Sequence, residues 1–316
     1  MKKLLLLTVI ALLSFALLSC SKSVSPVSDF KYRKTSSGVI IKEYIGNSAE
    51  VVIPDKIDGG PVVEIGMRAF IGKKIQSVTV PEGVKKIGEF AFSGCKELTS
   101  VELPEGLEVI DIGAFNNCTA LNDIDLPDTL TSLGTEAFYE CTSLKYIYLP
   151  GNITDFGSKV FGLCGLEEIE FSDKLKVLGY NAFGCTKVKS VEIPGSVEVI
   201  PGALFYFCDE LETVILNDGL KEIEGLAFDF CANLKSITIP ASVEKLAESA
   251  IENCLSLGKV VFEGNAPEID PVPEVVYSIE DGQPIKKTKS EKITVYYHEG
   301  AEGFGETWNG YKTQVW

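Results

Sequence analysis

The sequence predicts a solenoid of stacked coils, and three observations lead to this fold class. First, about nine consecutive units of 22 or 23 residues resemble one another from residue 65 to about residue 265. Second, cysteine recurs within them at intervals of 23 residues, with a single interval of 21. Third, apolar positions recur in step with the cysteines. Stacked coils would therefore place equivalent side chains in common interior rows.

Each unit predicts the same short elements, which the segment "IGEFAFSGCKELTSVELPEGLEV" illustrates. It begins with a turn that contains Ala91 and Phe92. The stretch "LTSVELP" then alternates apolar and polar residues, which is typical of a strand with one buried face. Pro104 lacks an amide hydrogen and ends this strand. The apolar pair Leu107 and Ile110 follows. We expect a parallel β-sheet on one face and short turns or strands on the other.

These units resemble the BspA-like, or Treponema-type, leucine-rich repeat family, whose pattern is "IGxxAFxxCxxLxxIxLPxxLxx". The resemblance covers about four-fifths of the chain. It implies a leucine-rich repeat solenoid with a capping coil at each end. The chain departs from the pattern at Lys73 in place of cysteine, at Ile251 in place of phenylalanine and at His298, where proline is common.

The first residues, "MKKLLLLTVIALLSFALLSC", combine a basic start, a short apolar core and a small residue before Cys20. The apolar run is too short to span a bilayer comfortably, which favours a secretory signal. "LLSC" resembles the lipobox of bacterial lipoproteins and implies lipid on Cys20; ordinary secretion is the alternative. The predicted organisation is a signal peptide (1–19), a lipidated cysteine with a flexible tether (20–37), an N-terminal capping coil (38–64), the repeats (65–265), an insertion (266–292) and a C-terminal coil (293–316).

The eight repeat cysteines allow three interpretations. Zinc needs clustered ligands, and the sequence has no CxxC pair and a single histidine. A disulfide framework fits an even count in a secreted protein, but equivalent residues in a stack point the same way. We therefore expect reduced cysteines that act as small buried hydrophobic side chains. The predicted core cysteines are Cys95, Cys118, Cys141, Cys164, Cys185, Cys208, Cys231 and Cys254.

The outward positions of the predicted strands suggest a binding face. Two tyrosines on one coil are flanked by acidic pairs on the coils before and after it. Aromatic rings in an acidic surround suit a basic protein segment or a glycan. The alternatives are that these residues only favour strand formation and solubility, or that the carboxylates hold calcium. The candidate residues are Tyr146, Tyr148, Asp123, Asp125, Glu168 and Glu170.

The sequence favours a binding protein over an enzyme. It contains no nucleophile elbow, P-loop, dinucleotide fingerprint or metalloprotease motif, and it predicts no metal and no cofactor. A formal net charge of −16 disfavours nucleic acid as a partner. The resemblance implies a surface-associated interaction protein. We expect a lipid-anchored monomer of the bacterial cell envelope, at the outer membrane or cell surface, with a periplasm-facing orientation as the alternative. The resemblance also implies adhesion to host or microbial surfaces. An envelope component without a dedicated ligand is the alternative.

Overall fold

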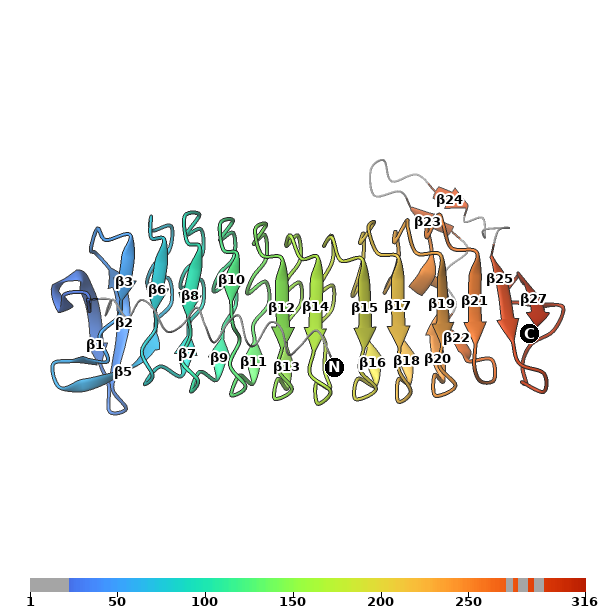
Figure 1. Cartoon of the computed structure of the whole chain (residues 1–316), viewed down its shortest axis with the longest axis horizontal. Helices are drawn as coiled ribbons and strands as arrows, with labels where there is room; N and C mark the ends of the chain where they lie inside the picture. The colour runs from blue at the N-terminus through green and yellow to red at the C-terminus, as the bar shows by residue number, and fades with distance from the viewer. Residues whose placement is uncertain (1–22, 271–274, 278–283, 287–292) are drawn as a thin grey trace, which may run out of the picture.

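The computed structural model describes residues 23–270, 275–277, 284–286 and 293–316. These residues form a β-solenoid of about ten turns of roughly 23 residues. The turns follow one another along the long axis from β1 to β27, and the strands lie across this axis (Figure 1). The predicted leucine-rich repeat solenoid is confirmed.

One strand from each turn joins a parallel ladder whose exposed side we call the strand face; at its C-terminal end one further strand, β26, pairs antiparallel with β27. Hydrogen-bonded pairing runs in the groups β10-β8-β6-β3, β12-β14, β15-β17 and β19-β21-β25-β27-β26. The strands are β3 (Glu50–Val52), β6 (Ser77–Thr79), β8 (Ser100–Glu102), β10 (Asp123–Ile124), β12 (Tyr146–Leu149), β14 (Glu168–Phe171), β15 (Ser190–Ile193), β17 (Thr213–Leu216), β19 (Ser236–Ile239), β21 (Lys259–Phe262), β25 (Thr294–Tyr297), β26 (Thr307–Trp308) and β27 (Tyr311–Val315).

A second ladder, in which most strands have two or three residues, follows the turn after most strands of the first; between Phe171 and Ser190 it has no strand. Its groups are β1-β2-β5-β7-β9-β11-β13, with β4 paired to β5, and β16-β18-β20-β22. The strands are β1 (Phe30–Lys34), β2 (Val39–Tyr44), β4 (Lys56–Ile57), β5 (Gly60–Ile65), β7 (Lys86–Ile87), β9 (Val109–Ile110), β11 (Ser132–Leu133), β13 (Asp155–Phe156), β16 (Val199–Ile200), β18 (Glu222–Ile223), β20 (Lys245–Ala247) and β22 (Glu268–Asp270).

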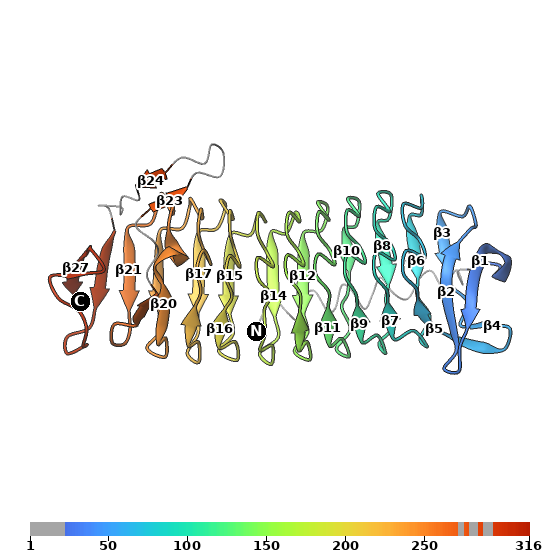
Figure 2. The same cartoon turned by 180° about the vertical axis from the view of Figure 1, so that it is seen from behind.

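Few elements depart from this pattern. Two short 3-10 helices are η1 (Val27–Asp29) and η2 (Glu248–Ile251). β23 (Val275–Tyr277) and β24 (Pro284–Lys286) pair antiparallel as a hairpin within the predicted insertion. Both views show this hairpin projecting from the C-terminal third of the solenoid (Figures 1 and 2).

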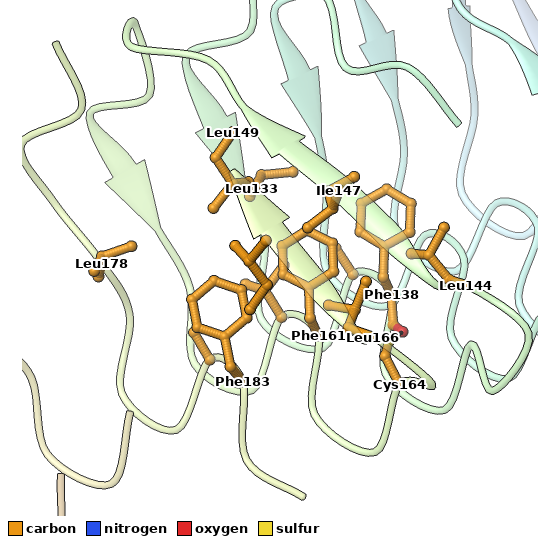
Figure 3. Packing of buried hydrophobic residues seen from close by; sticks show 14 of the residues in the cluster. Leu133, Phe138, Leu144, Ile147, Leu149, Phe161, Cys164, Leu166, Leu178 and Phe183 are labelled. Carbon is orange, nitrogen blue, oxygen red and sulfur yellow. Dashed lines mark hydrogen bonds between the residues drawn. The ribbon is translucent and has the colours of Figure 1, made fainter. Parts of the chain in front are cut away.

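Stacked aromatic rings run through the interior. From Tyr44 to Phe228, successive ring centroids are 4.8–5.8 Å apart, and the planes of each pair lie within about 21° of parallel. Figure 3 shows three of these rings, Phe138, Phe161 and Phe183, in a row. Each stacked pair contributes about 0.5–1.5 kcal/mol beyond the burial of its apolar area. The recurring phenylalanine therefore supplies the main repeated contact between coils.

Seven of the eight repeat cysteines lie buried in the corner between the turn and the strand, and all eight are free thiols. Each buried thiol donates a hydrogen bond to the carbonyl oxygen of the recurring phenylalanine one coil earlier, at 3.0–3.3 Å. For example, Cys118 Sγ donates to the Phe92 carbonyl at 3.1 Å. This small side chain thus fills the corner and gives a second donor to a carbonyl oxygen that already accepts a hydrogen bond, as the Phe92 carbonyl does from the Cys95 amide.

The prediction that Cys185 belongs to this interior row is wrong, because Cys185 is exposed. The interior position three residues after Phe183 is held by Thr186, whose hydroxyl donates to the Phe183 carbonyl at 2.9 Å and lies 3.3 Å from Cys208 Sγ. This repeat is one residue shorter than its neighbours, and aligning the repeats by their cysteines predicted that the missing residue lies before Cys185. The structure places it after Thr186, which leaves Cys185 one position early, in the exposed part of the turn.

The ends of the solenoid also differ from expectation. β1 pairs antiparallel with β2, so the predicted tether contains an ordered strand from Phe30 to Lys34. Phe30 is buried and its ring lies 5.5 Å from that of Tyr44, which explains why this segment packs. At the other end β22 pairs with β20, so the ladder continues to Asp270, into the predicted insertion. Residues 1–22, including the predicted signal peptide and Cys20, lie outside the described residues.

Candidate binding face

The two tyrosines project from the strand face because side chains alternate along β12. Ile147 and Leu149 point inward and are fully buried, whereas Tyr146 and Tyr148 point outward. β14 repeats this pattern, and its outward residues Glu168 and Glu170 stand in register with the tyrosines. We call these four residues, together with Asp123 and Asp125 on the preceding coil, the acidic tyrosine patch.

A hydrogen bond fixes the orientation of the exposed ring. Tyr146 Oη donates to Glu170 Oε2 at 2.9 Å, although the register partner of Tyr146 is Glu168. The tyrosine side chain therefore crosses diagonally over β14 and is 43% exposed. Tyr148 is half-buried beside it. The structure thus holds one tyrosine across the strand face instead of leaving it free in solvent.

The patch is negatively charged, and Tyr146 within it is neutral. Burial raises the pKa of Tyr146, and the hydrogen bond from its hydroxyl to Glu170, together with the charges of Glu170, Glu168 and Asp125, raises it further. These groups therefore lie close enough to interact. Asp123 is exposed at the start of β10, where it pairs in register with Ser100 on the side away from the tyrosines.

One ion pair lies on the same two coils. Lys145 Nζ is 2.8 Å from Glu167 Oε1, and both side chains are about half exposed. These residues precede Tyr146 and Glu168 in sequence. Because this lysine is already paired with a carboxylate, it leaves the charges of Glu168 and Glu170 uncompensated. The patch therefore presents aromatic and acidic groups to a ligand.

Sequence reasoning missed a second aromatic group on the strand face, nearer its C-terminal end. Lys259 Nζ lies 5.0 Å from the centre of the Tyr296 ring and 5.7 Å from that of Trp316. Both distances are within the range of a cation–π contact. The signal was available, because "ITVYYHEG" continues the strand alternation and places Tyr296 in an outward column.

The predicted absence of an enzymatic site has no direct test in the structure, but the one histidine can be located. His298 is exposed, and its ring lies 4.5 Å from that of Trp316. Within the described part of the chain, no three His, Cys, Asp or Glu side chains are grouped so that they could hold a metal ion. No helix in the same residues has the length and apolar character needed to cross a bilayer.

Two of the hollows on the described part of the solenoid lie away from the acidic tyrosine patch. One, of about 430 Å³, lies beside Tyr44 and Lys73 near the N-terminal end. The other, of about 510 Å³, lies over β18, β20 and β22 and includes Glu222 and Glu268. The acidic tyrosine patch lines neither hollow and lies on the open strand face.

A solenoid of stacked coils with an exposed ladder of short parallel strands is the architecture of leucine-rich repeat proteins, which are scaffolds for protein interaction. The model of the BspA type leucine rich repeat region matches residues 63–184 and 164–272. The chain belongs to this family.

One solved structure supports the family assignment. The leucine-rich repeat protein TpLRR of T. pallidum is 30% identical with a TM-score of 0.52, over 67% of this chain and 91% of that chain. A leucine-rich repeat protein from Bacteroides ovatus is 22% identical with a TM-score of 0.41, over 92% of this chain and 99% of that chain. No curated protein matches the sequence.

Proposed function

We propose that the chain is a non-enzymatic binding protein of the bacterial cell envelope, and that its strand face takes a basic segment of a host or microbial surface protein. The observation that carries this proposal is the exposed Tyr146 ring held among Asp125, Glu168 and Glu170. Aromatic side chains supply much of the energy at protein interfaces. Surrounding carboxylates favour a partner of opposite charge and speed its association.

The fixed position of the ring supports a binding role over a purely structural one. A tyrosine selected only for strand formation needs no partner at its hydroxyl, since water satisfies it. The hydrogen bond between Tyr146 and Glu170 instead orders the ring before any ligand arrives. Such ordering reduces the entropy that binding would otherwise cost.

Envelope anchoring is a separate part of the proposal and rests on "LLSC" at the end of the apolar leader. Lipid on Cys20 would hold the solenoid at a membrane, stably if more than one acyl chain is attached. A Cys20→Ala variant should move from the membrane fraction to the soluble fraction. Protease treatment of intact cells should degrade the wild-type protein if it is displayed at the surface; resistance would indicate that it faces the periplasm.

The binding role can be tested with purified protein on sensors that carry purified extracellular-matrix proteins, alongside a glycan array. We expect binding to at least one basic protein, and at least tenfold weaker binding by the Tyr146→Ser/Tyr148→Ser double variant. Thr213→Ser/Thr238→Ser, on the same face, is the matched control and should bind normally. Binding only to glycans would favour a carbohydrate ligand, and no binding to any probe would favour a structural envelope component.

A further inference from the structure

A second set of exposed apolar residues lies on the turns, outside the strand face. Two residues after each recurring phenylalanine, the backbone adopts a left-handed conformation with φ between about 53° and 71°. Glycine or asparagine, which suit this conformation, occupies the position in several coils, at Gly72, Gly94, Asn117 and Asn253. Four consecutive coils instead carry Leu163, Cys185, Phe207 and Phe230.

None of these four side chains suits a left-handed turn, and none of them is buried in the core. A bulky residue with positive φ is strained relative to glycine. Leu163 is 38% exposed and Phe207 is 44% exposed, and Cys185 is also exposed. Phe230 is half-buried. Since folding gains little from an apolar side chain left in solvent on a strained backbone, three exposed residues of this kind on consecutive coils point to a role outside folding.

The aromatic members form an ordered cluster. The rings of Phe207 and Phe230 stack at 4.3 Å with an interplanar angle of 9°. Tyr206 meets both rings edge-on, at 4.8 and 5.9 Å. On the other side of Cys185, the Tyr139 ring lies close over Gly162, where an added Cβ would be 3.1 Å from Tyr139 Cδ2. We call Tyr139, Leu163, Cys185, Tyr206, Phe207 and Phe230 the turn-edge patch.

The surround of the turn-edge patch is acidic. Partial burial raises the pKa of Tyr139, Cys185 and Tyr206, and the negative charge of a nearby carboxylate raises it further: that of Glu140, Asp209 and Asp229 respectively. The five turns that carry the patch (135–143, 158–166, 180–188, 202–211 and 225–234) contain five carboxylates and two lysines. The two lysines are Lys159 and Lys187.

We propose that the turn-edge patch is a second docking surface, distinct from the strand face, for a short segment of a partner protein in which an apolar or aromatic side chain is flanked by Lys or Arg. The exposed Phe207 ring and the half-buried rings around it receive the apolar side chain, and carboxylates that reach the surface, such as Glu140 and Asp209, pair with the flanking cations. A second copy of this chain is the wrong occupant. Self-association would bring two acidic surrounds together in a protein whose formal net charge is −16.

The test uses the whole protein and three fluorescent synthetic dodecapeptides. The first carries a Phe-Leu pair flanked by Lys and Arg, the second has Glu in place of the cations, and the third has Ser in place of Phe and Leu. Anisotropy should show binding of the first peptide, with at least tenfold weaker binding of the other two. Equal binding of the acidic or the serine peptide, or no binding of the first peptide at 1 mM, overturns the proposal.

Substitutions in the turn-edge patch and on the strand face identify where the basic peptide binds. Phe207→Asn/Phe230→Asn should weaken binding of the basic peptide at least tenfold. Its melting temperature should stay close to that of the wild type, because asparagine suits positive φ and so offsets the lost ring contacts. Tyr146→Ser/Tyr148→Ser removes the strand-face site, and this variant should still bind the basic peptide. Adding Phe207→Asn/Phe230→Asn to it should weaken that binding at least tenfold, which separates the two surfaces. The proposal is overturned if the asparagine variant binds like wild type, if the serine variant loses binding, or if sedimentation shows a dimer that depends on Phe207.

Cys185 offers an independent check in the wild-type protein. A bulky disulfide-forming reagent attached to this thiol would cover the patch. It should weaken binding of the basic peptide at least fivefold, and reduction with dithiothreitol should restore it. Full binding by the blocked protein would contradict a site at this position.

Discussion

Tyr146 and Glu170 are joined across two coils by a hydrogen bond of 2.9 Å, although the strand register places Tyr146 opposite Glu168. The bond commits the only proton of the tyrosine hydroxyl to the protein. A ligand therefore meets the ring, the free lone pairs of the hydroxyl oxygen and the neighbouring carboxylates. We infer that the ring and the negative charge, rather than hydroxyl donation, determine what binds here.

Separating the ring from its hydroxyl tests this inference. Tyr146→Phe keeps the ring and should retain most of the affinity for a strand-face ligand, whereas Tyr146→Ser should lose at least tenfold. The loss of one exposed hydrogen bond should destabilise Tyr146→Phe by less than about 1 kcal/mol. Binding isotherms and denaturant midpoints of both variants provide the check. If Tyr146→Phe loses as much affinity as Tyr146→Ser, the hydroxyl is the recognised group.

Close approach of the coils at the turn glycines predicts a selective stability effect. A Cβ added to Gly134 would lie 2.3 Å from the backbone nitrogen of Ile112 on the preceding coil. Gly134→Ala should therefore separate the coils and destabilise the protein by about 1–3 kcal/mol. Gly258→Ala is the control, because an added Cβ there has no neighbour within 4 Å. Equal unfolding midpoints for the two variants would contradict this packing.

The buried thiols predict a loss of stability at alkaline pH. Burial raises the pKa of six of them, to about 12 for Cys95, Cys208 and Cys254. In the unfolded chain a thiol titrates near pH 8.5, so above that pH the unfolded state releases protons that the native state keeps. The free energy of unfolding should therefore fall as pH rises from about 8.5 towards 12, by up to about 1.4 kcal/mol per pH unit for each thiol. The other three thiols are Cys118, Cys141 and Cys231.

A double variant isolates this effect from the titration of lysine and tyrosine. Cys118→Ser/Cys141→Ser replaces two of the six thiols with hydroxyl groups that can donate to the same carbonyls but do not titrate in this range. The slope of unfolding free energy against pH should become shallower by up to about 3 kcal/mol per pH unit. Chemical denaturation between pH 8 and 10.5 measures it. A slope equal to that of the wild type would show that the buried thiols do not control alkaline stability.

Thiol labelling distinguishes the exposed cysteine from the buried ones. In the native protein a maleimide should modify Cys185 alone among the eight repeat cysteines, and in denaturant without prior reduction it should modify all eight. Burial and the charge of Asp209 raise the pKa of Cys185. Its labelling should therefore be slower at pH 7 than that of a free cysteine and should still accelerate above pH 9. Mass spectrometry counts the adducts. Fewer than eight in denaturant would indicate disulfides.

Most of the solenoid could be predicted from the sequence because each repeat constrains the next. The columns of phenylalanine, leucine and proline each require the same stacking, and the structure has that stacking. The error at Cys185 arose where residue type and position disagree. Counting three residues from Phe183 identifies Thr186 as the interior residue. The left-handed backbone conformation at Cys185 cannot be predicted from the residue type alone.

Side-chain direction and isolated tertiary contacts were harder to predict. Strand alternation predicted that Tyr146 points outward, but the diagonal reach to Glu170 is a choice of side-chain conformation. The strand at Phe30–Lys34 depends on packing against Tyr44, which a segment rich in serine and lysine does not suggest. The turn-edge patch could not be predicted because residue type varies at its turn position, from Gly72 and Asn117 to Phe207, although the position itself recurs in every repeat.

Site-directed photo-crosslinking tests the central claim, that the strand face binds a partner through Tyr146, most directly. Benzoylphenylalanine is placed at position 146, and in a second protein at position 238 on the same face, and each is incubated with the extracellular-matrix proteins that the wild type retains. We predict a covalent adduct from position 146 and little or none from position 238. Equal adducts from both positions, or an adduct from position 238 alone, would contradict a binding site centred on Tyr146.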